Sequence, residues 1–298
     1  MNNLDDIAAG VAAGIDYTRR FGGVSRLYGE AAAARFATAR VCVVGIGGVG
    51  SWAAEALARS AVGRITLVDL DMIAESNTNR QVHALGDAYG MAKVDAMRSR
   101  IVQINPTCEV TVIEDFVSEE NVARLLGGYD VVLDAIDDVR VKTAMVVFCR
   151  AANVPLFVCG GAGGKSDPAR IRIDDLTRTT RDPLLAKLRK RLRQNHGFPR
   201  DIRRRFGIPT VYSDELVLDS ESCALDEAPQ GLSCAGYGSS VCVTASMGLF
   251  AAAAVLKLLS SSAAAVSAAK TTAEGASDSS PSMMQSQDGG NDACMSQP

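Results

Sequence analysis

The sequence predicts an α/β fold in which a doubly wound parallel sheet carries helices on both faces, in a three-layer α/β/α arrangement. Two observations predict it. Short apolar runs rich in β-branched residues alternate along the chain with longer segments of helical periodicity, and this alternation is typical of βαβ units. The first apolar run also leads directly into the glycine cluster GIGGVG at 45–50 and then into an alanine-rich, helix-like stretch.

Five apolar runs are expected to form the strands of this sheet. They lie at 41–45, 64–71, 109–116, 129–137 and 155–160, and the segment 169–176 is a candidate for a further strand. Helices are expected directly after the glycine cluster, at 93–104 and at 142–153. In the segment 93–104, apolar residues recur at helical spacing (Val94, Met97, Ile101, Ile104).

Several polar residues and the glycine cluster fall where these strands end. Asp69 and Asp71 end the second run, and Asp137 ends the fourth. Because the carboxyl ends of parallel strands meet at one edge of a sheet, where ligands of such sheets bind, we expect these residues to lie together.

Length and composition indicate a soluble globular protein organised around one main domain. The chain has 298 residues, of which 47% are hydrophobic and 22% charged, which is enough for a sizeable core. We expect a flexible N-terminus at 1–17, one domain at 18–258, and a disordered tail at 259–298, because that tail lacks aromatic residues and is rich in Ser, Ala, Gln and Gly.

The cysteines indicate a reducing compartment and argue against a zinc site. There are eight, and no two form a C-x-x-C pair. The first ten residues, MNNLDDIAAG, also lack the basic region of a secretory signal. We therefore expect a cytoplasmic protein with buried, reduced thiols and no zinc.

A strongly basic segment interrupts an otherwise slightly acidic chain. The formal net charge is −3, but residues 178–205 contain eleven Lys or Arg and only two acids. Within it, 183–195 is expected to be an amphipathic helix with Leu185, Leu188 and Leu192 on one face. Such a run is either a solvated surface or a patch that binds a phosphate backbone.

Residues 239–256 contain no charge and are just long enough to suggest a membrane span. They consist mainly of Ala and other small residues, which give weak insertion energy. A buried helix that closes the domain is therefore favoured over membrane contact.

The glycine loop alone leaves two kinds of nucleotide site open. Gly45, Gly47 and Gly50 form G-x-G-x-x-G, and Asp69 lies where an acid that binds ribose would stand. That pattern fits a nicotinamide oxidoreductase as well as an enzyme that binds ATP. The helix that follows offers free N–H groups to an anion in either case.

The segment after the second strand favours ATP. Arg80 and Lys93 are suited to the β- and γ-phosphates, and Asp137 is a candidate ligand for Mg²⁺. A nicotinamide site needs one acid there and little more, so these charges together argue against it.

The order of short motifs resembles one known family. The chain reads G-x-G-G-x-G, D-x-D, S-N-x-x-R-Q, G-x-x-K, INP and D-x-x-D in turn. Over roughly 20–165 this order resembles the ubiquitin-activating-enzyme-like adenylyltransferases of ThiF, MoeB and HesA type, which implies a Rossmann-like adenylation fold. The segments RFGGVSRLYGE, NTNRQVHAL, GGAGG and CAGYGS resemble the tRNA threonylcarbamoyladenosine dehydratase subgroup, with similarity to about residue 258.

The resemblance implies a role for each matched residue. The phosphates of ATP would be lined by the loop glycines (Gly45, Gly47, Gly48 and Gly50) and contacted by Asn77, Arg80 and Lys93. Asp69 and Asp71 would hold the ribose or organise the site, and Asp137 would hold Mg²⁺. The catalytic residues would be Arg80, Lys93 and Asp137.

The resemblance also implies partners and a reaction. The expected substrate is tRNA carrying threonylcarbamoyladenosine beside its anticodon, dehydrated to the cyclic form through an acyl-adenylate. Relatives form homodimers in which one subunit sends an arginine into the other's site, and Arg20 and Arg26 are the candidates here. A cysteine desulfurase system and a monovalent cation are further associations that it suggests. Cys234, within CAGYGS, is a candidate thiol whose default role is structural.

One alternative function stays open within the same family. The chain would then activate the C-terminus of a small ubiquitin-like sulfur-carrier protein. The lack of two C-x-x-C pairs, which the sulfur-carrier activators use for zinc, argues against it.

Overall fold

A seven-stranded sheet forms the centre of the computed structural model, which describes residues 15–217 and 238–277. Its strand order is β3-β2-β1-β4-β5-β7-β6. The strands are β1 (Arg40–Val44), β2 (Arg64–Val68), β3 (Glu109–Ile113), β4 (Val131–Asp134), β5 (Leu156–Cys159), β6 (Ile171–Asp175) and β7 (Pro209–Ser213). The α/β class and all five main predicted strands are confirmed, although most strands end earlier than the apolar runs suggested.

The prediction of a wholly parallel sheet is wrong at one edge. β6, within the candidate strand at 169–176, runs antiparallel to β7, whereas every other neighbouring pair is parallel. The cause is the connection before β6. After β5 the chain passes through 160–170 without an α-helix that would return it to the opposite edge of the sheet, so β6 starts where β5 ends.

Helices cover both faces, as predicted, and the alternation of side chains in β1 explains why. Val41 and Val43 face a core built with α4 (Gly50–Arg59) and α5 (Lys93–Ile104). Cys42 and Val44 face a second core built with α7 (Val139–Ala151) and α8 (Pro183–Asn195). A strand with apolar side chains on both faces is what a doubly covered sheet requires.

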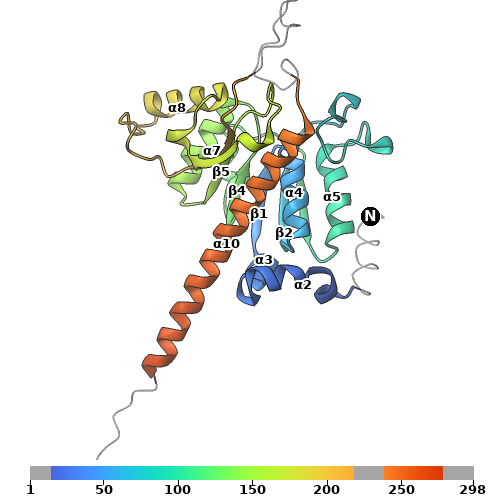
Figure 1. The fold of residues 1–298 in the computed structure, drawn as a ribbon, viewed down its shortest axis with the longest axis vertical. Coiled ribbons are helices and arrows are strands. Elements are labelled where there is room, and N and C mark those ends of the chain that lie inside the picture. The colour runs from blue at the N-terminus through green and yellow to red at the C-terminus, as the bar shows by residue number, and fades with distance from the viewer. Residues whose placement is uncertain (1–14, 218–237, 278–298) are drawn as a thin grey trace, which may run out of the picture.

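The remaining described α-helices complete the two layers. α2 (Tyr17–Tyr28) and α3 (Glu30–Thr38) lie below the first core in Figure 1, and α6 (Val122–Leu126) packs beside α7. Short 3₁₀ turns occur at Glu75–Asn77, Gly86–Ala88, Pro168–Arg170 and Leu176–Arg178. The predicted start of the domain at 18 falls within α2.

The helix predicted at 183–195 is confirmed as α8. Asp182 caps it by accepting a hydrogen bond from the Leu185 N–H at 3.0 Å, and Pro183 occupies the first turn. Leu185, Leu188 and Leu192 are fully buried. The leucine face therefore belongs to the core, and the basic residues of this helix lie on its other sides.

The uncharged segment at 239–256 forms the first half of α10 (Val241–Ser277), which packs against α4 and α3 (Figure 1). One stripe of it is buried, namely Val243, Met247, Ala251, Val255 and Leu259. Residues 241–263 are long and apolar enough to cross a membrane by composition, but 44% of the most apolar window is buried in the protein. The observed packing is that of a closing helix. The helix continues past 258, where the sequence placed the domain boundary, and projects from the body in Figure 1.

The strand order reverses between β1 and β4, because β2 and β3 lie on one side of β1 and β5 lies beyond β4. In doubly wound sheets a crevice opens outside the carboxyl ends of the strands at such a point. The glycine loop follows β1 and Asp137 follows β4, so the sequence placed both at this switch point.

Candidate active site

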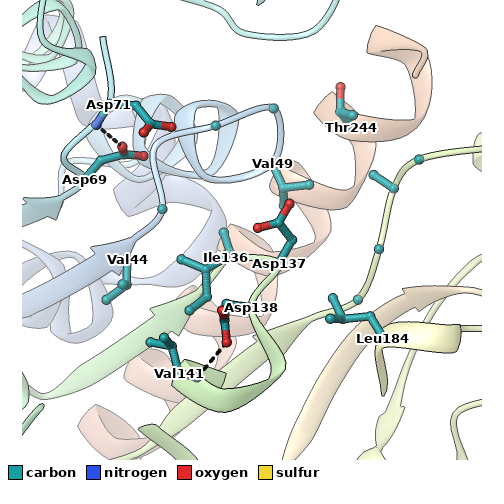
Figure 2. Close-up of a pocket in the computed structure, with 18 of the residues that line it drawn as sticks. Val44, Val49, Asp69, Asp71, Ile136, Asp137, Asp138, Val141, Leu184 and Thr244 are labelled. Carbon is teal, nitrogen blue, oxygen red and sulfur yellow. Dashed lines mark hydrogen bonds between the residues drawn. The ribbon is translucent and has the colours of Figure 1, made fainter. Parts of the chain in front are cut away.

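A cavity of about 570 Å³ opens at the switch point. Its walls come from the glycine loop, the end of β2, the β4–α7 loop, the β5–β6 loop and the first turn of α10 (Figure 2). Of the predicted site residues, Gly45, Gly47, Gly48, Asp69, Asp71, Arg80, Lys93 and Asp137 line it. Gly50 and Asn77 do not.

The glycines of the loop meet different constraints. Gly45 has φ +87°, and a Cβ there would lie 2.9 Å from the Ile136 side chain. A Cβ on Gly50 would collide with the carbonyl oxygen of Gly45, so Gly50 allows helix and loop to pack. A Cβ on Gly47 would meet no protein atom within 4 Å. Gly47 thus leaves open space on the cavity side, where a ligand can approach the backbone.

Asp69 anchors the loop to the end of β2. Its Oδ2 accepts a hydrogen bond from the Ile46 N–H at 2.6 Å, and its Oδ1 accepts one from the Asp71 N–H at 2.9 Å. The second bond is drawn in Figure 2. Both oxygens of the carboxylate are engaged, so Asp69 ties the glycine loop to the segment after β2.

Lys93 brings a buried cation to the same wall. It is the first residue of α5 and only 6% exposed. Its Nζ lies 2.5 Å from Oδ2 of Asp71 and 3.9 Å from Oδ1 of Asp69. Because the Asp71 side chain is 73% exposed, it can move toward solvent and leave the ammonium to an anionic ligand.

Arg80 lies across the glycine loop, where its Cγ would be 3.3 Å from a Cβ on Gly48. Its Nη1 donates to the Ser76 carbonyl at 2.6 Å and to the Asn79 side chain at 3.0 Å. Asn77 supports this turn rather than facing the cavity. It is buried, its Oδ1 accepts from the Ala74 N–H, and its carbonyl accepts from the Arg80 N–H.

Three acids of the β4–α7 loop have three different settings. Asp134 is fully buried, and its Oδ1 accepts from the Lys142 ammonium at 2.8 Å and from the Ile136 N–H at 3.2 Å. Asp138 caps α7 by accepting from the Arg140 and Val141 N–H groups. Asp137 lies between them, exposed to the cavity, and Figure 2 shows it set apart from Asp138, which turns toward Val141.

Asp137 suits a cation whose other ligands come from the substrate. The described part of the chain holds no group of three or more His, Cys, Asp or Glu side chains that could bind a metal. Mg²⁺ is commonly held by one or two carboxylates together with phosphate oxygens and water. Asp137 is exposed to the cavity, whereas Asp69 and Asp71 contact Lys93 and Asp138 caps α7. The Asp137 carboxylate therefore fits Mg²⁺ bound with a nucleotide, and not a metal held by protein alone.

The half of the cavity lined by the β5–β6 loop and the start of α8, called the far half below, contains residues that the sequence did not predict. The half lined by the glycine loop, Arg80 and Lys93 is the near half. Lys165 follows the GGAGG segment, is 4% exposed, and donates to the Ser213 carbonyl at 3.0 Å. Its Nζ lies 3.6 Å from Asp182, which also accepts from the Gly161 N–H at 2.9 Å. Burial lowers the pKa of Lys165, and the Asp182 carboxylate opposes that shift. The GGAGG segment was the available signal, but a loop lysine has no periodicity to reveal it.

Gln81 is a second residue that the site assignments left out. It lines the cavity and is 6% exposed, and its Oε1 is buried without a hydrogen-bond partner among the described residues. The R-Q pair at 80–81 is part of the sequence motif, but the pattern assigns a role only to its arginine.

Arg20 and Arg26 are the candidates for an arginine exchanged between subunits. Arg20 donates from Nη1 to the carbonyls of Ile104 at 2.9 Å and Gln103 at 3.3 Å, at the end of α5 in its own chain. Arg26 lies exposed in the last turn of α2. The predicted exchange of an arginine between subunits stays a prediction for both residues. Cys234 lies outside the described residues.

The described cysteines do not supply a reactive thiol in the cavity. Four are buried (Cys42, Cys108, Cys149 and Cys159), and burial raises the pKa of Cys108, Cys149 and Cys159 to about 12. Such thiols stay protonated and inert at neutral pH. Cys242 is exposed on the first turn of α10 but is not among the residues that line the cavity.

The basic segment at 178–205 divides into packed and exposed arginines. Arg189 contacts the Thr179 hydroxyl, and Arg193 donates to the Pro199 carbonyl at 3.2 Å and stacks over Phe206. The exposed cations of this segment are Arg178, Arg181, Lys187, Lys190, Arg200, Arg203, Arg204 and Arg205. The segment begins beside the cavity, because Asp182 and Leu184 line its far half.

Comparison with known proteins connects this geometry to a family. The model of the ThiF family matches residues 17–288. The chain is 49% identical over 246 residues to the tRNA threonylcarbamoyladenosine dehydratase of Escherichia coli K12, covering 80% of this chain and 92% of that protein. It is 43% identical to the Haemophilus influenzae protein of the same name, covering 82% and 94%.

A solved structure and a more distant relative complete the comparison. The E. coli dehydratase in complex with ATP superimposes with a TM-score of 0.76 at 47% identity, covering 83% of this chain and 96% of that one. The E. coli molybdopterin-synthase adenylyltransferase is 37% identical over only 123 residues, 41% of this chain. The similarity to the dehydratases is thus higher and far longer than the similarity to a carrier-protein activator.

Proposed function

The chain belongs to the ThiF family, and from that premise we propose that it is an ATP-dependent tRNA threonylcarbamoyladenosine dehydratase. The observation that carries the proposal is the site itself. A glycine loop with open space at Gly47, the cations Arg80, Lys93 and Lys165, and the exposed carboxylate of Asp137 line a cavity in a fold that a relative uses to bind ATP.

In the proposed reaction, ATP converts a carboxylate of the modified adenosine into a group that can be displaced. The modification ends in a free carboxylate, which is a poor electrophile. Attack of a carboxylate oxygen on the α-phosphorus of ATP forms an acyl-adenylate and breaks the bond to pyrophosphate. The ureido part of the same modification then attacks the acyl carbon, and AMP leaves. The net change is loss of one water, and because the nucleophile is already tethered, proximity supplies much of the rate.

The near half of the cavity binds the nucleotide in this proposal. The backbone at Gly47 and Gly48 faces the phosphates, together with the N-terminus of α4. Arg80 and Lys93 balance the charge that develops on the phosphates during adenylation. Asp69 stays near Lys93 when the exposed Asp71 gives way to the phosphates. Asn77 holds the turn that carries Arg80.

Asp137 is the residue that would hold Mg²⁺ in this proposal. When bound, the ion supplies charge neutralisation at the phosphate that is attacked. Asp134 and Asp138 bind their own loop and helix, which leaves Asp137 as the carboxylate available to the ion.

The far half of the cavity receives the modified adenosine. The β5–β6 loop and the start of α8 line it, and Asp182 ties the two together through the Gly161 N–H and the cap of α8. Lys165 is the one cation among the described residues that line this half. It is therefore our candidate partner for the substrate carboxylate, which competes there with Asp182, 3.6 Å from the Lys165 ammonium.

The exposed cations of 178–205 hold the anticodon arm by its phosphates. They continue from the far half of the cavity along α8, which is where tRNA must lie if its modified base enters that half. A base taken out of its stack can then reach the site. We further propose that the enzyme works in the cytoplasm. We also propose that it is a homodimer, and the molar mass of the purified chain from light scattering would test this.

One experiment tests the reaction directly. tRNA carrying threonylcarbamoyladenosine is incubated with the protein and ATP·Mg²⁺ and is then digested. The masses of its nucleosides are measured by mass spectrometry. The expected result is loss of one water from the modified nucleoside, abolished in Lys93→Ala and Asp137→Ala. An unchanged nucleoside in the presence of active pyrophosphate exchange would refute the dehydratase and leave an adenylating enzyme for a protein carrier.

A further inference from the structure

The turn that carries Arg80 is fastened to α4 by a tryptophan. Trp52 stands in the first turn of α4, and its Nε1–H donates to the Arg80 carbonyl at 3.0 Å. Its ring is half-buried and packs against the core of the first face. The bond is long-range in sequence, because it joins the helix after the glycine loop to the segment after β2.

Two further contacts fix the same segment from other elements. Ser51, also on α4, accepts a hydrogen bond from the Val82 N–H at 3.4 Å. Thr244, on the first turn of α10, has its Oγ1 3.5 Å from the Arg80 carbonyl. Residues 80–82 are therefore held between α4 and α10, and the shortest of these three contacts is the one from the indole. The neighbouring Asn79 is held separately, because its Nδ2 donates to the Ser239 carbonyl at 2.9 Å.

The side chain of Arg80 needs this support. It is long, it lies over Gly48, and the two described groups to which its guanidinium donates, the Ser76 carbonyl and the Asn79 side chain, belong to its own turn. If that turn shifts, both partners shift with it, and the guanidinium leaves the phosphates together with them. Only a bond to a different element sets where the turn lies relative to the glycine loop.

We propose that Trp52 is a positioning residue, whose indole N–H fixes the Arg80 carbonyl so that the Arg80 guanidinium meets the phosphates of the nucleotide. This inference rests on the proposed function only in requiring that ATP binds in the near half of the cavity. The fixed backbone lowers the entropy lost when ATP binds, because the arginine is already confined to the glycine loop.

The test is Trp52→Phe, which keeps an aromatic ring and removes the N–H donor. Loss of one hydrogen bond should weaken ATP binding by about three- to tenfold, measured by calorimetry without tRNA. KM for ATP should rise by about the same factor, and kcat should fall as well, because Arg80 also balances the charge that develops during adenylation. The decisive control is Arg80→Ala, because in that background Trp52→Phe should change ATP affinity less than about 1.5-fold.

A second variant and a spectroscopic signal separate positioning from general damage. Thr244→Val, which removes the weaker contact to the same carbonyl, should produce a smaller loss in the same direction. Trp52 is the single tryptophan of the chain, so saturating ATP should change the fluorescence of the native protein and change it less in Arg80→Ala.

Two results would overturn the inference. In the first, Trp52→Phe weakens ATP binding equally with and without Arg80, as a merely structural role would. In the second, Trp52→Phe leaves ATP affinity unchanged. Failure of the dehydratase reaction would appear separately, as intact ATP binding with no dehydrated nucleoside. Absence of ATP binding by the native protein would refute both proposals.

Discussion

Gly47 and Gly50 are three residues apart, but glycine is required at the two positions for different reasons. A Cβ at Gly50 would enter the carbonyl oxygen of Gly45, whereas a Cβ at Gly47 would enter only the space of the cavity. The G-x-G-x-x-G pattern in the sequence predicted close ligand approach at the middle glycine and helix packing at the last. The geometry of the loop agrees with both.

The first prediction compares alanine at these two positions. Gly50→Ala should lower the free energy of unfolding by more than about 2 kcal/mol, because backbone must move to admit the methyl group. Gly47→Ala should leave the melting temperature nearly unchanged and weaken ATP binding by about tenfold or more, because the methyl group occupies ligand space. Calorimetric melting and ATP titration of both variants check this, and equal melting temperatures for the two would contradict it.

The second prediction separates two buried lysines. Lys93 faces the cavity, whereas Lys142 is fully enclosed, 2.8 Å from Asp134 and from the Cys159 carbonyl. Lys93→Ala should reduce ATP–pyrophosphate exchange by about a hundredfold with little loss of stability. Lys142→Ala should cost about 3–5 kcal/mol of stability, because Asp134 keeps a buried charge without its partner. A stable Lys142→Ala protein would show that Asp134 takes up a proton at little cost.

At the scale of elements, the spacing of apolar residues predicted the amphipathic helices but not the features that lack a regular pattern. The helix at 93–104 and the leucine face of 183–195 could be predicted because apolar residues recur at helical spacing. The direction of β6 could not, since a strand pattern reads the same in both directions. β7 was missed because its five residues, PTVYS, follow the basic segment without a strong apolar run. Lys165 and Gln81 sit in irregular segments, where only the folded chain shows what a side chain faces.

The third prediction concerns the basic element. Reversing the exposed charges of Arg203, Arg204 and Arg205 to Glu should weaken tRNA binding and make its logarithmic salt slope shallower by about 1 or more. The melting temperature should stay nearly constant, because the ion pair of this group, between Arg203 and Asp201, is 88% exposed on the arginine side.

The control for that variant reverses two arginines away from the basic segment. Arg64 begins β2, and Arg19 lies exposed in the first turn of α2. Their reversal makes the net charge more negative by 4, against 6 for the triple variant, without touching the proposed surface. Losses of tRNA affinity in proportion to these charge changes would mean that 178–205 acts only through overall charge.

At the scale of the whole molecule, the packing of one histidine makes stability depend on pH. His83 is 2% exposed, and both of its ring nitrogens lack a hydrogen-bond partner among the described residues. Burial lowers the pKa of His83 from 6.5 to about 4, and the positive charges of Lys93 and Arg100 act in the same direction. The folded protein therefore holds this ring neutral, under the influence of Lys93 of the candidate site and Arg100 of the same helix α5.

The fourth prediction is that His83 lowers the free energy of unfolding as pH falls from 6.5 to 4. The unfolded chain takes up a proton as pH falls below 6.5, whereas the folded chain does so only near pH 4, so stability is complete above 6.5 and is lost across the interval. The loss should approach about 3 kcal/mol, since each pH unit is worth about 1.4 kcal/mol. Denaturant unfolding of the native protein and of His83→Leu at pH 7, 5.5 and 4.5 measures it. The variant should lack most of this decline and keep the steeper loss near pH 4 and below, where carboxylates with lowered pKa values such as Asp175 and Asp130 become protonated. Parallel curves for the two proteins would mean that solvent reaches His83 and that its pKa is ordinary.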